Sequence, residues 1–140
     1  MSVEEIEAKR AARKATAAKA REEQYEKDLA ALDALEEEFG DGSVAALEVT
    51  GYVAGLPTLM VVKSPGKTGL YKRYSDMVRR SGGKAEKVGE AQDMLGTACI
   101  AYPDAEVRKA MFEAFPGMAI TAAIRALKFV ELEAADEKKS

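Results

Sequence analysis

The run from Val3 to Phe39, which contains neither glycine nor proline, constrains this chain more than any other feature. Alanine, glutamate, lysine, arginine and leucine dominate it, and these are the strongest helix formers. We therefore predict one long helix, ended by a C-cap glycine and turn at Gly40-Asp-Gly-Ser43. The helix is electrically divided, because the stretch from Lys9 to Arg21 has no acidic residue and the stretch from Glu22 to Asp41 is strongly acidic.

The two halves of this helix also differ in hydrophobicity. In the second half, large apolar residues recur at intervals of three and four, which predicts docking on a core; they are Tyr25, Leu29, Leu32, Leu35 and Phe39. Residues 8–20 offer only alanine. Four alanines fall on a heptad-like spacing that continues through Glu22 into the second half, namely Ala8, Ala11, Ala15 and Ala18. Two interpretations stay open: a solvated helix that extends past the domain, or a thin coiled-coil seam that binds a partner.

The rest of the chain predicts a small hairpin followed by helices. Val44 to Val53 and Thr58 to Val62 indicate two strands around a turn that contains glycine and proline. Helices are expected from about Leu70 to Arg80, over 85–100, over 105–114 with Asp104 as N-cap, and from Met118 to about Leu132. The predicted inward residues include Leu70, Tyr71, Tyr74, Met77, Val78, Val88, Ala91, Met94, Leu95, Ala98, Cys99, Ile120, Ala123, Ile124, Leu127 and Val130.

The predicted fold is therefore α+β and mainly helical, with a long N-terminal helix, a small antiparallel hairpin and about four helices around one core. We expect a charged helical extension over residues 1–24, a single globular domain over 25–132 and a charged tail over 133–140. A chain of 140 residues is long enough for one such domain and too short for two. A free edge of the hairpin could accept a strand from a partner.

The composition argues against most catalytic chemistry. The chain has no histidine, which is the commonest general base and metal ligand, and its single cysteine, Cys99, has no charged neighbour in sequence. Ser64-Pro-Gly-Lys-Thr-Gly69 imitates the end of a phosphate-binding loop, but Val61 occupies the place of the first glycine. We predict a strand-to-helix turn there, no catalytic, cofactor or metal site anywhere, and no enzymatic activity.

Charge and hydropathy bound the partners and the compartment. The formal net charge of -3 and the pI near 5.2 argue against nucleic acid as a partner. The sequence begins without the pattern of a signal peptide, and no apolar run is long enough to span a bilayer, so we expect a cytoplasmic protein without a membrane partner. The predicted partner-binding residues are the basic ones at Arg73, Arg79 and Arg80 and, on the long helix, at Lys9, Arg10, Arg13 and Lys14.

One ordered series of segments carries a family resemblance. It comprises Gly55-Leu-Pro, Leu59-Met-Val-Val, Tyr71-Lys-Arg-Tyr74, Arg79-Arg80, Ala98-Cys-Ile-Ala-Tyr-Pro-Asp104 and Phe115-Pro-Gly117 followed by an alanine-rich helix. From about Gly55 to Leu127 the chain resembles the tail assembly chaperones of long-tailed bacteriophages. The long bipolar helix does not match that pattern. The resemblance implies a non-catalytic protein of the host bacterial cytoplasm that binds the tape measure protein, the tail tube protein, or both.

Two functional hypotheses follow. In the first, the protein is a transient chaperone that uses the hairpin edge, the arginine surface and the helical arm to hold a helical client during tail assembly. In the second, it is a structural or adaptor component of a phage or phage-like particle, a homo-oligomer that self-associates through its N-terminal helix. A chaperone leaves the finished particle, whereas a structural component remains in it.

Overall fold

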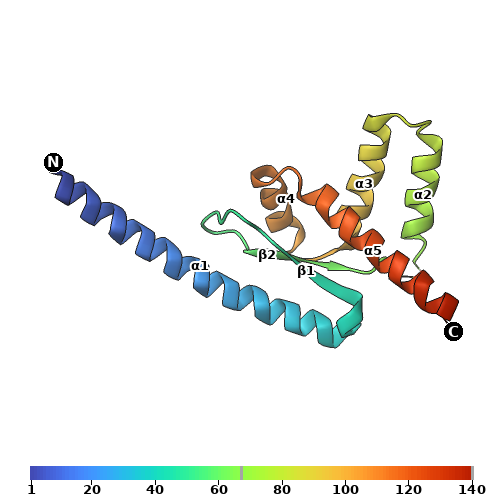
Figure 1. The fold of residues 1–140 in the computed structure, drawn as a ribbon, viewed down its shortest axis with the longest axis horizontal. Helices are drawn as coiled ribbons and strands as arrows, with labels where there is room; N and C mark the ends of the chain where they lie inside the picture. Colours follow the sequence, from blue (N-terminus) through green and yellow to red (C-terminus); the bar gives the residue numbers. More distant parts are fainter. Residues whose placement is uncertain (67, 140) are drawn as a thin grey trace.

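The computed structural model describes residues 1–66 and 68–139, with side chains as far as Glu131. A long helix underlies a small sheet, and further helices lie above it (Figure 1). The elements are α1 (Val3–Phe39), a short 3₁₀ turn (Asp41–Ser43), β1 (Val44–Glu48), β2 (Leu59–Lys63), α2 (Leu70–Arg80), α3 (Ala85–Cys99), β3 (Ile100–Tyr102), α4 (Ala105–Ala114) and α5 (Met118–Lys139). The predicted α+β, mainly helical fold is confirmed.

Helix α1 has the predicted bounds, and both its ends are capped. The Ser2 hydroxyl accepts a hydrogen bond from the Glu5 N–H at 3.1 Å, and Glu4 and Glu5 place negative charge in the first turn, which the helix dipole favours. At the other end Gly40 has φ 94°, and its N–H donates to the Glu36 carbonyl. Residues that carry a side chain rarely adopt that backbone angle, whereas glycine does so readily, and Gly40 therefore ends the helix.

The sheet has three antiparallel strands in the order β1-β2-β3. Val44 pairs with Lys63 and Glu48 with Leu59, and Val61 pairs with Tyr102 on the other side. The prediction of a two-stranded hairpin was therefore incomplete, and the predicted last residue of the second helix, Ile100, begins β3. Strand β3 is only three residues long, too short for an alternating pattern to show. Because β3 covers one side of β2, the strands at the free edges are β1 and β3.

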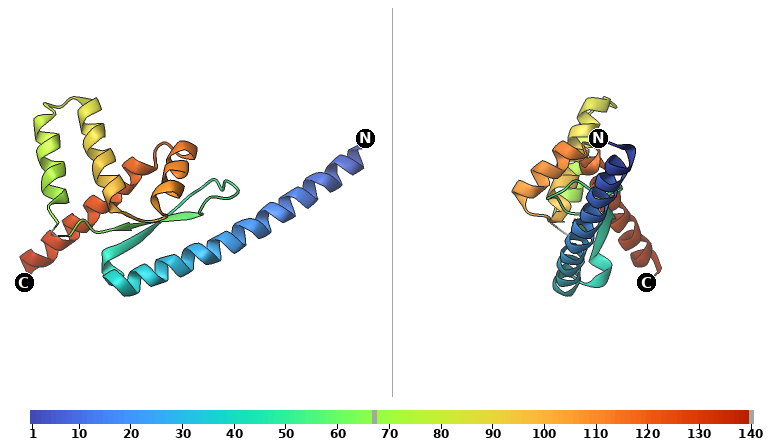
Figure 2. Two further views of the ribbon diagram at one scale, coloured as in Figure 1. Left: turned by 180° about the vertical axis from the view of Figure 1, so that it is seen from behind. Right: turned by 90° about the vertical axis from the view of Figure 1, so that its left-hand side faces the viewer.

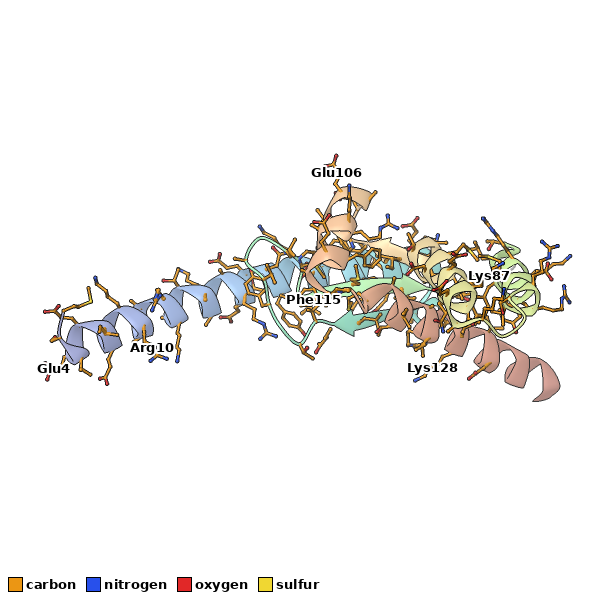
Figure 3. All side chains as sticks on the ribbon, turned by 90° about the horizontal axis from the view of Figure 1, so that it is seen from above. Glu4, Arg10, Lys87, Glu106, Phe115 and Lys128 are labelled. Carbon is orange, nitrogen blue, oxygen red and sulfur yellow. The ribbon has the colours of Figure 1, made fainter. Side chains whose placement is uncertain are left out.

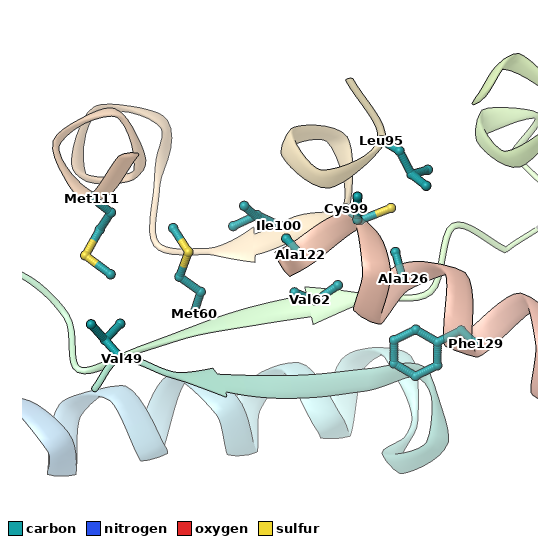
Figure 4. Packing of buried hydrophobic residues seen from close by; sticks show 11 residues of the cluster. Val49, Met60, Val62, Leu95, Cys99, Ile100, Met111, Ala122, Ala126 and Phe129 are labelled. Atoms are coloured by element: carbon teal, nitrogen blue, oxygen red, sulfur yellow. The ribbon is translucent and has the colours of Figure 1, made fainter. Parts of the chain in front are cut away.

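Strand β2 is buried on both faces, which explains its continuous apolar run. Leu59 and Val61 pack with Leu32 and Leu35 of α1, together with Val44 and Tyr102. Met60 and Val62 point to the opposite side, into the main core formed with α3, α4 and α5 (Figure 4). The sheet is thus the middle layer between α1 and the other helices.

The docking face of α1 differs from the predicted one. Leu32 and Leu35 do pack on the sheet, but Tyr25, Leu29 and Phe39 are 37%, 40% and 41% exposed. The side chain at the centre of the docked face is Asp28, which is fully buried. Position 28 lies four residues after Gln24 and four before Leu32, and the predicted row of large residues lies to one side of this face.

Helix α5 presents alanines to the core. Ala119, Ala122, Ala123 and Ala126 are buried, whereas Ile120 and Ile124, predicted to point inward, are 41% and 51% exposed. The reason lies on α3: a Cβ added at Gly96 would come within 2.0 Å of the Ala119 carbonyl oxygen. The two helix backbones are so close that only small side chains fit between them.

Two further positions predicted to point inward are exposed, Tyr71 on α2 and Ala98 on α3. Tyr71 lies at the margin of the apolar stripe of α2, and Ala98 is one residue away from the buried Cys99, so each falls just outside the contact with its neighbouring helix. The helix predicted to end near Leu132 continues to Lys139. Nothing in Glu133-Ala-Ala-Asp-Glu-Lys-Lys139 breaks a helix. Ser140 and the side chains of the predicted charged tail lie outside the described residues.

The first half of α1 extends beyond the body of the molecule (Figure 2). Every side chain from Met1 to Glu23 is exposed, and the first partly covered one is Gln24. We call residues 3–23 the arm. No side chain of the arm is therefore buried against the body, and the arm contributes little to the stability of the body.

Deleting residues 1–20 is expected to leave the melting temperature of the body nearly unchanged, because none of the deleted side chains is buried. Differential scanning calorimetry of both chains at high ionic strength, which screens contacts between exposed charges, measures this. Loss of a cooperative transition in the shortened chain would show that the division between arm and body is wrong.

Candidate partner-binding surfaces

The basic residues of the arm are all accessible. Lys9, Arg10, Arg13 and Lys14 are exposed, and Figure 3 shows Arg10 on the free part of α1, far from the body. They belong to the stretch from Lys9 to Arg21 that contains no acidic residue. This stretch of the arm thus presents a run of positive charge to the solvent.

The three predicted arginines of α2 are also exposed, but they are not equivalent. Arg79 forms an ion pair with Asp76 on the same helix. Arg73 and Arg80 lie seven residues apart on one row of the helix, and neither forms an ion pair with a described residue. None of the eleven residues of α2, all of which are described, is buried. The half-buried apolar stripe of α2 is therefore only thinly covered.

These two basic surfaces do not form one site. The arm points away from one end of the molecule, and α2 stands at the other end (Figures 1 and 2). A single small ligand could not touch both. The arm and α2 therefore present two separate basic surfaces.

A groove of about 320 Å³ lies where the arm leaves the sheet. Its lining comes from α1, from β1 and from the residue before β2; these residues are Ala18, Arg21, Glu22, Tyr25, Glu48 and Thr58. We call it the arm-base groove. Carboxylates, a guanidinium and an exposed phenol ring share the lining, so the groove combines both signs of charge with an aromatic surface.

Asp28 fixes the base of the arm, and the sequence analysis missed it. One carboxylate oxygen accepts hydrogen bonds from the Thr58 N–H and hydroxyl, both at 2.6 Å. The other accepts from the Tyr102 hydroxyl at 2.5 Å and from the Gln24 amide at 2.9 Å. Burial, and then the bond to Asp28, raise the pKa of the Tyr102 hydroxyl above its ordinary value. This cluster ties α1, β2 and β3 together.

A spacing signal for Asp28 was present in the sequence. Gln24, Asp28, Ala31 and Leu35 are separated by four, three and four residues, so they lie on one face of α1. The predicted docking face was instead the neighbouring row of larger apolar side chains. One carboxylate among many acidic residues does not stand out by residue type.

An exposed apolar row on α5 was also missed. Ile120 and Ile124 lie one turn apart and continue toward Lys128, which is exposed as well. Two isoleucines one turn apart are typical of the positions through which one helix packs against another. The sequence signal for this orientation was the small size of Gly96 on α3 and of the alanines that face it on α5. Small residues mark the contact between the two helices, so the isoleucines of α5 must lie on the opposite side.

The reactive groups of the chain are arranged for structure. Burial raises the pKa of the Cys99 thiol to about 11, so this fully buried group stays protonated at neutral pH. Across the described residues, no cluster of three carboxylate or cysteine side chains could hold a metal ion.

Residues 64–66, 68 and 69 lie between β2 and α2, where a strand-to-helix turn was predicted. The Gly66 N–H donates to the Ser64 hydroxyl at 3.1 Å, and the Thr68 hydroxyl donates to the Pro65 carbonyl at 2.7 Å. Lys67 lies outside the described residues.

Within the described part of the chain, no single helix is both long enough and apolar enough to cross a membrane. The pair of α4 with the Met118–Glu131 part of α5 has enough length and apolar character together, but it is bent by 113°. Comparisons of the chain with protein-family models, with curated proteins and with solved structures found no match.

Proposed function

We propose that the protein is a non-catalytic tail assembly chaperone of a long-tailed bacteriophage and that it binds the tape measure protein before the tail is complete. Tail tube subunits are the second client that the family resemblance implies. The proposal places the protein in the cytoplasm of the host bacterium. It rests on the ordered segments from Gly55 to Leu127 together with one feature of the surface.

That feature is the exposed isoleucine row of α5. Ile120 and Ile124 are 41% and 51% exposed, and they belong to the alanine-rich helix that ends the family-like region. A tape measure protein is a long helical chain whose apolar stripes need cover before assembly. A client helix whose apolar residues recur at intervals of three and four could pack its apolar stripe against Ile120 and Ile124 of α5. Arg73 and Arg80, exposed on α2, would offer a separate charged contact to acidic segments of the client.

The test is co-expression with a tape measure protein. We expect the client to be more soluble with this chain than without it, and the two to co-purify. The double variant Ile120→Asp and Ile124→Asp should lose co-purification, because charges would face an apolar stripe. Val53→Asp is the matched control, since Val53 is also 41% exposed but lies in the loop between β1 and β2. A client equally soluble in all cases would rule the proposal out.

The alternative of a structural or adaptor component is favoured by one observation, the exposed and charged arm. A permanent component can use such an arm to pack against other copies in a particle. Mass spectrometry of purified particles separates the two functions, because a chaperone is missing from the finished particle. A stoichiometric amount of this chain in mature particles would favour the structural function.

A further inference from the structure

Two consecutive segments of α1, residues 8–21 within the arm and residues 22–39 after them, carry opposite charges of matched size. Residues 8–21 contain six basic and no acidic side chains. Residues 22–39 contain eight carboxylates and one lysine, and one of the carboxylates is the buried Asp28, already hydrogen-bonded within the body. The remaining seven carboxylates and Lys27 leave a formal charge of -6 on residues 22–39, against +6 on residues 8–21. This division lies along one uninterrupted helix.

We propose that α1 binds α1 of a second copy of this chain in antiparallel orientation. In a parallel pair, the basic residues 8–21 of the two copies would lie side by side, and so would the acidic residues 22–39. In an antiparallel pair, the basic stretch of each copy lies along the acidic half of α1 of the other. A two-fold axis then makes the same contact twice. The inference does not depend on the proposed chaperone function.

The lengths of the two halves agree with this arrangement. At about 1.5 Å per residue, residues 8–21 extend over about 20 Å and residues 22–39 over about 26 Å. Two such helices can therefore overlap with their centres close to residue 20. The arm projects clear of the body, so a second helix can reach it (Figure 2).

In the antiparallel orientation, the apolar row on α1 of one copy also fits the same row on the second copy. The alanine spacing of the arm leads into Tyr25 and Leu29, which are 37% and 40% exposed. With the centres near residue 20, Ala11 lies opposite Leu29 of the second copy, and Ala15 lies opposite its Tyr25. Small residues facing large ones let the helices approach closely. The arm-base groove borders this row at Ala18, Glu22 and Tyr25, and leaves about 320 Å³ for side chains of the second copy.

Sedimentation velocity of the protein alone tests the association. We expect a dimer at about 50 mM sodium chloride and a monomer at about 500 mM, because the screening length falls about threefold between them. A monomer at both concentrations would overturn the proposal. The measurement needs no client, so its outcome is separate from that of the co-expression test.

Charge reversal shows whether the two halves of α1 recognise one another. A variant with Lys14→Glu, Lys19→Glu and Arg21→Glu should be monomeric at low salt, and so should one with Glu22→Lys, Glu26→Lys and Asp33→Lys. An equimolar mixture should form dimers again, because each reversed half meets its opposite charge. Circular dichroism checks that each variant keeps its helix content. Failure of the mixture to associate would contradict charge-directed pairing, because the two sets of reversed charges would then not compensate one another.

Cysteine cross-linking tests the orientation. The Ala11→Cys and Leu29→Cys variants should form a disulfide with each other when mixed and none when alone, because Cys99 is buried and does not compete. A parallel pair would instead cross-link each variant with itself. Self-cross-linking of the Ala11→Cys variant would therefore overturn the antiparallel assignment.

Discussion

The Gly96→Ala variant is expected to lose about 3 kcal/mol of its free energy of unfolding, near the upper end of the cost of overpacking. The added Cβ would come within 2.0 Å of the Ala119 carbonyl oxygen, 3.0 Å of its carbonyl carbon and 3.1 Å of the Ala123 nitrogen. All three atoms belong to the backbone of α5, so no side chain can swing away. Relief requires α3 and α5 to separate, which loosens the core around Ala122 and Ala126. Urea denaturation followed by circular dichroism measures the loss.

Helix α3 offers a matched control in Gly89. A Cβ added there meets no atom within 4 Å, so Gly89→Ala removes only the entropic cost of glycine in a helix. We expect a gain of about 0.5 to 1 kcal/mol from that variant. The same substitution on the same helix should thus change stability in opposite directions. Equal effects would mean that α3 and α5 are not in the close contact described.

Long helices and their ends could be predicted from local sequence. Val3–Phe39 needed only residue propensities and Gly40, and α4 needed the N-cap at Asp104, whose carboxylate accepts a hydrogen bond from the Val107 N–H at 3.0 Å. Both signals lie within a few residues of the feature that they determine. The predicted helix bounds of α2, α3 and α4 were accordingly close to those observed.

Features that depend on distant contacts could not be predicted in this way. Strand β3 exists because Ile100 and Tyr102 meet β2, about 40 residues earlier in the chain. Ile120 and Ile124 point outward because Gly96 brings α3 close, although a count of hydrophobic residues would turn the isoleucines inward. In both cases the partner decides the conformation, and the partner is not visible in the local pattern.

The candidate surfaces divide along the same line. The basic residues at Lys9, Arg10, Arg13 and Lys14 were predicted as exposed because charged side chains on a helix without apolar residues have nothing to pack against. The arm-base groove was not predicted, because it forms only where Glu48 and Thr58 approach α1. That approach is set by Asp28, whose role depends on Thr58, 30 residues later in the sequence.

The Asp28→Ala variant is expected to lose about 3 to 5 kcal/mol of stability, because each buried donor left without its acceptor costs about 1 to 3 kcal/mol. The substitution leaves the Thr58 N–H and the Tyr102 hydroxyl without their acceptor, and both lie in the interface of α1 with the sheet. Asp33→Ala is the control, because Asp33 is exposed on the same helix and should change stability by no more than about 0.5 kcal/mol. Chemical denaturation of the two variants gives the comparison.

The Tyr102→Phe variant distinguishes a hydrogen-bonded cluster from simple loss of packing. It removes one donor to Asp28 and leaves the ring in place, so we expect a loss of about 1.5 to 3 kcal/mol, as for a bond to a charged group. In the Asp28→Ala background the same change should cost much less, since its acceptor is already absent. Fully additive losses would show that the two groups do not act on each other.

Native-state hydrogen exchange should locate the defect of Asp28→Ala. Leu32 and Leu35 still pack on the sheet in this variant, whereas the turn of α1 around Gln24 loses its attachment. We therefore expect the amides of residues 24–31 to lose protection first, while those of α3 and α5 exchange only by global unfolding. Equal loss of protection in all three helices would mean that Asp28 supports the whole core and does not specifically fix the base of the arm.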